Sequence, residues 1–329
     1  MTKVTIRDVA KNAGVSPTTV SRVLNNRGYI SDEMKKKVHD SIEELGFIPN
    51  EMARSLFSNK TKLIGLIIPT TSNPFFGELT YHIEKHLSKL DYKLLVCNSI
   101  NESENEKKYL RMLQENRVDG IIVGSHNIDI EEYEKMPLKM VSVERSLGGS
   151  IPTIQSDNYH GGYIATEELI NAECQNILCI SGDPRLQTPA NDREKAYLDC
   201  IGNHNMMSHV AHIPFTKSNK EKNKRVFEIL QSSPKIDGVF AGDDLMASIV
   251  INQANKLGIE VPKELKVVGF DGTENIRTIL PDLSTVKQPI ALLAEKSVEV
   301  LLDEIDNKQV PMSTILPVEL ISNKSSKTI

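Results

Sequence analysis

Apolar residues recur at two different spacings along the 329-residue chain, and the spacing changes near residue 60. Before that point they fall three or four positions apart, as on one face of an α-helix, in three short stretches between residues 6 and 45. From Leu63 onwards they form short β-rich runs separated by longer amphipathic segments. The first pattern predicts a small helical module, and the second predicts parallel sheets with helices on both faces.

Ten β-rich runs fall into two groups of about five, so the larger part of the chain is predicted to form two doubly wound lobes. The second lobe is expected to start near Tyr159, and a crossing segment is expected after Gln288. Sheets of this kind bind ligands at the carboxyl ends of their strands, and between two lobes that region becomes a cleft. The runs are LIGLIIP, KLLVCNS, GIIVGS, MVSVER and TIQSD, then NILCISG, VAHIPF, GVFAGDD, LKVVGF and STVKQ.

The first helical stretches carry clear start and stop signals. Thr5 can cap the first helix with Asp8 as its acidic partner, and Gly14 can end that helix in the left-handed conformation. Ser16 is then a second N-cap, and Pro17 suits the first helical position. These signals predict two short helices joined by a four-residue turn, with a third helix that Ser31 caps and Gly46 ends.

The second helix has an apolar inner side and a polar outer side. Its outer positions lie near its N-terminal end, the part that helix-turn-helix proteins place in the major groove. A helical hairpin that only packs against another segment is the alternative, but caps, turn and outer positions agree on DNA binding. Val20, Val23 and Leu24 face inward, and Pro17, Thr18, Ser21 and Arg22 face outward.

Composition fits one small module followed by a large one, with 39% apolar and 25% charged residues. The four cysteines form no Cys-x-x-Cys pair and have no metal-ligand spacing with histidine, which predicts free buried thiols. No nucleophile, base and orienting residue form a set. We therefore expect no catalytic residues, no metal and no cofactor. Without an apolar run of membrane-spanning length or an apolar leader, a cytoplasmic location is expected.

The sign of the charge changes along the chain. Residues 1–60 contain ten Lys or Arg against seven Asp or Glu, whereas the remaining residues contain 29 against 37. A basic first module on an acidic body fits a protein that contacts phosphate at one end only.

The stretch TIRDVAKNAGVSPTTVSRVLN resembles the N-terminal signature of the lactose/galactose (LacI/GalR) repressor family. The resemblance implies a transcriptional repressor that binds a pseudo-palindromic operator as a homodimer. It also implies that the PNEMARSLF segment is a hinge that folds in the minor groove, where Leu56 would unstack a base step. A flexible linker is the alternative for that segment, because so short a helix does not persist alone. The residues assigned to DNA are Thr5, Ser16, Pro17, Thr18, Thr19, Ser21, Arg22 and Asn25, with Asn50, Ala53 and Leu56 in the hinge.

The family resemblance also predicts the domain organisation and the fold class. The fold expected is an all-α helix-turn-helix head followed by an α/β core, whose two doubly wound parallel-sheet lobes are of the periplasmic-binding-protein type. Residues 1–48 would form the head, 49–60 the hinge and 61–329 the effector-binding and dimerisation core. Within the core, the first lobe would comprise about 61–158 and 290–319, and the second about 159–289 and 320–329.

The segments SNPFF, VERS, SDN, DREKAY, GDD, GFDGTE and VKQP resemble those of repressor cores and ribose-type binding proteins. Planar donors, carboxylates and aromatic rings suit a sugar, whose hydroxyls take paired hydrogen bonds and whose C–H faces stack on rings. Glu144 stands where aspartate is usual and Asp243 where asparagine is common, which argues against plain ribose. The expected effector site consists of Asn73, Phe75, Phe76, Glu144, Arg145, Arg193, Phe215, Asp243, Asp271 and Gln288.

The segments LLVCNS, NRVDGIIVGSHN and IQSDN resemble the sucrose-operon branch of the family, which implies a sugar or sugar phosphate among sucrose, fructose and their phosphates. Carboxylates outnumber arginines in the expected site, which favours a neutral fructose-containing sugar. The alternatives are a ribose-type repressor, a catabolite regulator that answers to a phosphorylated carrier protein, and a transport-type sugar-binding protein. We interpret the lysine-rich stretch 217–225 as a solvated helix face.

Overall fold

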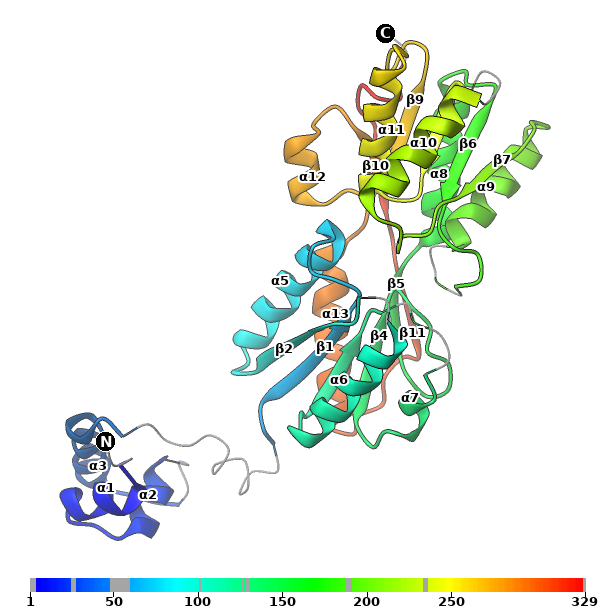
Figure 1. The fold of residues 1–329 in the computed structure, drawn as a ribbon. Helices are drawn as coiled ribbons and strands as arrows, with labels where there is room; N and C mark the ends of the chain where they lie inside the picture. The colour runs from blue at the N-terminus through cyan, green and yellow to red at the C-terminus, as the bar shows by residue number, and fades with distance from the viewer. Residues whose placement is uncertain are drawn as a thin grey trace. The chain divides into compact units, whose positions relative to one another are not determined.

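The computed structural model describes residues 4–24, 28–47, 60–100, 102–125, 127, 130–186, 188, 191–232 and 236–327. The chain divides into two compact units, Met1–Lys62 and Leu63–Ile329. Both are drawn in Figure 1. The predicted residues Asn25, Asn50, Ala53 and Leu56 lie outside the described residues.

The first unit contains three helices in its described part, α1 (Ile6–Ala13), α2 (Pro17–Leu24) and α3 (Asp32–Leu45). The predicted end signals are confirmed: Asp8 Oδ2 accepts from the backbone N–H of Thr5 at 2.8 Å, and Thr19 N donates to Ser16 Oγ at 3.0 Å. Gly14 and Gly46 end their helices with φ of 66° and 59°. The buried core is formed by Val9, Ala10, Val20, Val23 and Val38.

The second unit contains two sheets of six strands each in its described part. The first has the order β11-β5-β4-β3-β1-β2 and is parallel throughout. Its strands are β1 (Leu63–Ile68), β2 (Lys93–Asn98), β3 (Gly120–Val123), β4 (Lys139–Val143), β5 (Thr153–Ser156) and β11 (Ser313–Leu316). Its helices are α5 (Pro74–Ser88), α6 (Ser103–Glu115), α7 (Glu132–Lys135) and α13 (Ile290–Ile305).

The second sheet has the order β12-β10-β9-β8-β6-β7, in which only the β10–β12 pairing is antiparallel. Its strands are β6 (Ile177–Ser181), β7 (His209–His212), β8 (Gly238–Ala241), β9 (Lys266–Asp271), β10 (Ser284–Lys287) and β12 (Glu319–Ile321). Its helices are α8 (Asn158–Asn171), α9 (Asn191–Asn203), α10 (Asn219–Ser232), α11 (Asp244–Lys256) and α12 (Glu274–Ile279).

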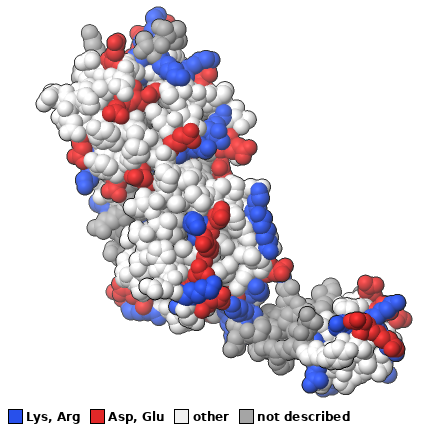
Figure 2. Space-filling view, turned by 180° about the vertical axis from the view of Figure 1, so that it is seen from behind, with Lys and Arg blue, Asp and Glu red and all other residues white. Residues whose placement is uncertain are grey.

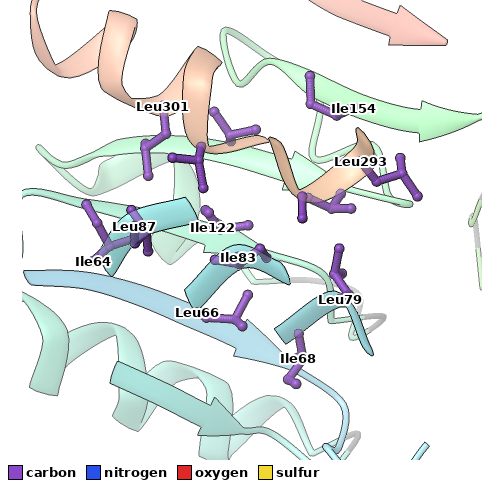
Figure 3. Close-up of a cluster of buried hydrophobic side chains, with 14 of the residues drawn as sticks. Ile64, Leu66, Ile68, Leu79, Ile83, Leu87, Ile122, Ile154, Leu293 and Leu301 are labelled. Carbon is purple, nitrogen blue, oxygen red and sulfur yellow. The ribbon is translucent and has the colours of Figure 1, made fainter. Parts of the chain in front are cut away.

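Helices cover both faces of the first sheet, as its apolar pattern predicts. α5 and α13 pack on one face, where Ile64, Ile83 and Leu293 belong to a single buried cluster (Figure 3). The opposite face is buried against α6 and α7 through residues such as Leu113 and Tyr133. Strands buried on both sides, such as β1 and β3, are continuous apolar runs, which is why they were recognisable in the sequence, whereas β2 and β7 are less buried.

The chain passes between the two sheets after β5, after β10 and between β11 and β12. The ten predicted strands are present, but β11 and β12 were not predicted. β11 and β12 are short and mostly exposed, with only Leu316 buried among their residues, so they lack the apolar run that marks a buried strand.

Candidate effector site and DNA-reading helix

A cavity of about 460 Å³ opens at the carboxyl ends of the strands, between the two sheets of the second unit. That size is within the roughly 300–1,000 Å³ range of small-molecule sites. Residues from both sheets line it. Nine of the ten residues predicted for the effector lie on its wall: Asn73, Phe75, Phe76, Glu144, Arg193, Phe215, Asp243, Asp271 and Gln288.

Arg145, the tenth predicted residue, does not line the cavity, and its assignment is corrected. Its Nη1 donates to the carbonyl oxygen of Ser125 at 2.7 Å, and its Nη2 donates to the carbonyl of Asn127. It also lies 3.5 Å from the carboxylate of Glu106. The reason is local backbone geometry: Glu144 adopts a left-handed φ of 51°, so that Glu144 lines the cavity while Arg145 reaches into the first lobe.

Arg193 is the central cation of the cavity wall. Its guanidinium carbon lies 3.5 Å from the centroid of the Phe270 ring, which is a cation–π arrangement. It donates to Asn158 Oδ1 and to the carbonyl of Gly242, each at 2.7 Å, and lies 3.9 Å from Asp271 Oδ1. Burial lowers the pKa of Arg193, and the nearby carboxylate of Asp271 opposes this effect. These contacts hold a planar donor at a fixed place in the wall.

Three buried carboxyl groups surround Arg193. Burial raises the pKa of Glu144, while the charge of Arg193 lowers it, and burial raises the pKa of Asp271 well above its usual range. Burial also raises the pKa of Asp244 to about 7, against hydrogen bonds from Thr285 and Gly272. Of the three, Glu144 and Asp271 line the cavity, where a carboxyl group can accept from sugar hydroxyls and, when protonated, also donate to them.

Hydrogen bonds and one ion pair link six residues at the base of the cavity into a closed ring. Ser156 Oγ donates to Gln288 Oε1 at 2.7 Å, and Gln288 Nε2 donates to Asp271 Oδ1 at 2.7 Å. On the other side Asn158 Nδ2 donates to Glu144 Oε2 at 2.9 Å. We call this set the base ring: Glu144, Ser156, Asn158, Arg193, Asp271 and Gln288. It ties together the ends of strands from both sheets.

Two predicted residues have a second role at helix ends. Asn73 caps α5 by accepting from Phe75 N at 2.9 Å, and Asp243 caps α11 by accepting from Met246 N at 2.6 Å. Phe75 and Phe76 are buried behind Asn73 with their rings edge to face. The caps fix where these polar groups stand, because an N-cap residue must lie at the start of its helix.

Some cavity residues were missed in the sequence. Lys217 and Lys222 line the wall. Lys217 is nevertheless exposed, whereas Lys222 is partly buried, so the interpretation of the lysine-rich stretch as purely a solvated helix face is wrong at Lys222. Asp183 and Asn191 also line it. Asn158 and Asp244 support the wall from behind, and the SDN and GDD motifs that contain them were the available signal.

In the first unit, the outer row of α2 is accessible as predicted. Pro17, Thr18 and Arg22 are exposed, Ser21 is partly buried, and Val20 and Val23 form the inner side. Thr5 and Ser16, which begin α1 and α2, are also exposed, and Thr19 is partly buried. The geometry presents a short polar row along the outer side of the second helix of a helix-turn-helix pair, from Pro17 in its first turn to Arg22 in its last.

The fold and the cavity define a class of protein: a helix-turn-helix module joined to a two-lobed, periplasmic-binding-type core. Residues 5–50 match the lacI family of bacterial regulatory proteins, and residues 166–326 match the periplasmic binding protein-like domain. The sucrose operon repressor of Pediococcus pentosaceus is 43% identical over 96% of this chain and 97% of its own. The sucrose operon repressor of Streptococcus mutans is 41% identical over 97% of this chain and 98% of its own. The chain belongs to the lacI family.

Solved structures have the same fold. The lac repressor dimer bound to operator and the anti-inducer ONPF has a TM-score of 0.88 at 24% identity, covering 99% of this chain and 100% of that chain. A periplasmic binding protein/LacI transcriptional regulator from Alkaliphilus metalliredigens, solved in complex with D-xylulofuranose, has a TM-score of 0.74 at 30% identity. The match covers 80% of this chain and 98% of that chain.

Family membership makes the protein a DNA-binding transcriptional repressor with a sugar-binding domain, and not an enzyme. Among the described helices, none has the length and apolar character required to cross a membrane.

Proposed function

We propose that the protein represses an operon for the use of sucrose or fructose, and that a neutral fructose-containing sugar in the cavity controls it. The observation that carries this proposal is the base ring, which presents fixed carboxyl, amide and guanidinium groups beside the rings of Phe75 and Phe76. The similarity over nearly full length to two sucrose operon repressors supports it.

The charge of the cavity favours a neutral ligand. Among the described residues of its wall, carboxyl groups outnumber cationic side chains by five to three. A dianionic phosphate would meet the carboxyl groups that remain ionised, whereas sugar hydroxyls can form hydrogen bonds with carboxyl groups in either protonation state. The carboxyl groups are those of Glu144, Asp183, Glu194, Asp243 and Asp271, and the cations are Arg193, Lys217 and Lys222.

On DNA, the proposal assigns base reading to the outer row of α2. Arg22 presents a planar fork suited to guanine O6 and N7, and Thr18 and Ser21 contact neighbouring bases. Thr5, Ser16 and Thr19 would contact the sugar-phosphate backbone of the DNA. Pro17 would make an apolar contact with the DNA. Asn25 and the hinge residues Asn50, Ala53 and Leu56 complete the proposed contacts. Two copies of the chain would place two such helices on a pseudo-palindromic operator.

The effector would act through the relative rotation of the lobes. A ligand that contacts both sheets can change the spacing of the two hinge segments in a dimer, provided that it binds the two states with different affinities. The boundaries proposed for this mechanism are 1–48 for the head, 49–60 for the hinge and 61–329 for the core.

A ribose-type repressor is the second candidate, because the ribose operon repressor of Halalkalibacterium halodurans is 38% identical over 98% of this chain. Calorimetry with fructose, sucrose, sucrose 6-phosphate and ribose separates the two. Binding of fructose or sucrose supports the proposal. Tight binding of ribose alone, or binding of sucrose 6-phosphate alone, overturns the proposal that the effector is a neutral fructose-containing sugar.

A further inference from the structure

A second buried polar cluster lies in the first lobe, outside the cavity. Glu106 on α6 is completely buried, and its carboxylate accepts from Asn127 Nδ2 at 2.6 Å and from the hydroxyl of Tyr133. Arg145 lies 3.5 Å from the same carboxylate and is 8% exposed. We call Glu106, Tyr133 and Arg145 the anchor cluster.

Stability alone is a weak reason for this cluster. Removing two charges from water costs several kcal/mol per ion, and well-packed apolar side chains of similar volume are often as stable or more stable. Apolar side chains, among them Leu110, Leu113 and Ile130, share the buried region of Tyr133. The contacts of the cluster with the neighbouring backbone are therefore the stronger reason for it.

It holds the backbone beside two parts of the cavity wall. Arg145 directly follows Glu144, a non-glycine residue with a left-handed φ of 51° whose backbone N–H donates to Ile154 O at 3.0 Å. Arg145 also binds the carbonyls of Ser125 and Asn127, in the segment that begins with Gly124. A β-carbon placed on Gly124 would lie 3.5 Å from Cε1 of Phe76, so this segment begins close to a ring of the wall.

The left-handed conformation of Glu144 needs such support, because that region costs an L-residue roughly 1–2 kcal/mol. Backbone strain of this kind persists only where neighbouring contacts over-determine the geometry. On one side the carboxylate of Glu144 is held by Ser156 N and Asn158 Nδ2. On the other side, the anchor cluster holds the next residue.

We propose that the anchor cluster is a positioning device: Arg145, held by Glu106 and Tyr133, keeps Glu144 directed into the cavity and so sets effector affinity without touching the effector. The part of this proposal that concerns effector affinity rests on the proposed function of the cavity. The part that concerns the position of Glu144 is independent of that function.

The first experiment needs no ligand. The backbone N–H of Ser156 donates to Glu144, so its exchange with deuterium reports whether that carboxylate is in place. In Arg145→Lys, which keeps the charge but loses the planar fork, we expect Ser156 exchange to rise about tenfold relative to amides of β1. Unchanged exchange at Ser156 in a folded variant overturns the proposal.

A matched control separates positioning from general destabilisation. Ser297 is completely buried in α13 of the same lobe, and its hydroxyl donates to Leu293 O, within its own helix, at 2.6 Å. Ser297→Ala should lower stability and leave Ser156 exchange relative to β1 unchanged. Equal acceleration in both variants would show that any loss of stability has the same effect.

The second experiment tests coupling and affinity. As a single substitution, Glu106→Gln should accelerate the exchange of the Ser156 amide. In the Arg145→Lys background it should add little, because the two substitutions act through one network. If Arg145→Lys does not fold, Tyr133→Phe serves instead, since it removes only the hydroxyl that binds Glu106. Strict additivity of the two changes, or no effect of Tyr133→Phe, contradicts the proposal.

Affinity is measured by calorimetry with fructose, sucrose and sucrose 6-phosphate. For the sugar that binds the wild type, Kd should rise about tenfold in Arg145→Lys, while operator binding without sugar and the Kd of Ser297→Ala stay unchanged. An unchanged Kd overturns the affinity part of the proposal. If none of the sugars binds the wild type, the proposed function fails, and the Ser156 exchange still decides the positioning role.

Discussion

Ser156 Oγ donates a hydrogen bond of 2.7 Å to Gln288 Oε1, and this bond joins the end of a strand in one lobe to the end of a strand in the other. Both side chains are almost completely buried. Gln288 uses its amide nitrogen for Asp271 at 2.7 Å, so Ser156 fixes which way the amide faces. The same bond therefore connects the two lobes and orients a side chain of the proposed effector site.

Ser156→Ala should raise the Kd of the effector about three- to tenfold, because Gln288 loses the donor that orients its amide, a loss of roughly 0.5–1.5 kcal/mol. Calorimetry measures the effect. Ser142→Ala is the matched control, since Ser142 is also a buried strand serine but bonds Thr153 and Pro152 instead. An equal rise in Kd for both variants would rule out a specific role for the Ser156–Gln288 bond.

Asp271→Asn should give a repressor that binds operator but responds weakly to sugar. The change keeps the shape of the side chain and removes the carboxylate that faces Arg193 at 3.9 Å. We expect sugar affinity to fall at least about tenfold, as for the loss of a charged hydrogen bond. Fluorescence anisotropy on operator, with and without sugar, measures both properties. Loss of operator binding in a folded variant would mean that Asp271 is structural.

The stability of the core should fall as pH rises towards neutrality, because burial raises the pKa of Asp244 to about 7 from an ordinary value of 3.8. Between these two values the folded state holds a proton that the unfolded state has lost, so raising the pH favours unfolding. Urea unfolding from pH 5 to pH 8 should show a steeper decline in wild type than in Asp244→Asn. Parallel pH profiles would show that Asp244 does not titrate in this range.

Arg22→Ala should cost about 1–3 kcal/mol of operator binding and relax the preference at one base pair in each half-site. Arg22 is exposed on the outer row of α2, so the change should leave the head folded. Binding to operator and to random duplex at the same salt concentration is the measurement. Arg7→Ala removes an exposed arginine outside the outer row of α2 and is the control, expected to leave the base preference unchanged. Equal loss on operator and random duplex for Arg22→Ala would limit Arg22 to phosphate contact.

Local signals in the sequence determined the elements of this protein. Caps such as Ser16 and Ser31, and the terminating residues Gly14 and Gly46, placed the helices of the head, because capping depends on residues adjacent in the chain. Apolar-rich runs placed ten strands, and those buried on both faces, such as β1 and β3, must be apolar throughout. The strand-end positions of Glu144, Asp243 and Asp271, which all line the cavity, followed from those runs.

Only the tertiary structure decided which way particular side chains face and which distant segments meet. The left-handed turn at Glu144 sends Arg145 into the first lobe, and neither its φ nor the buried partner Glu106 can be read from neighbouring residues. Lys222 lines the cavity because the packing of α10 brings it there, although its local pattern is that of an exposed helix. Sequence periodicity reports whether a position is buried within its own element, whereas contacts such as Ser156 with Gln288, 132 positions apart, depend on how the two sheets are assembled.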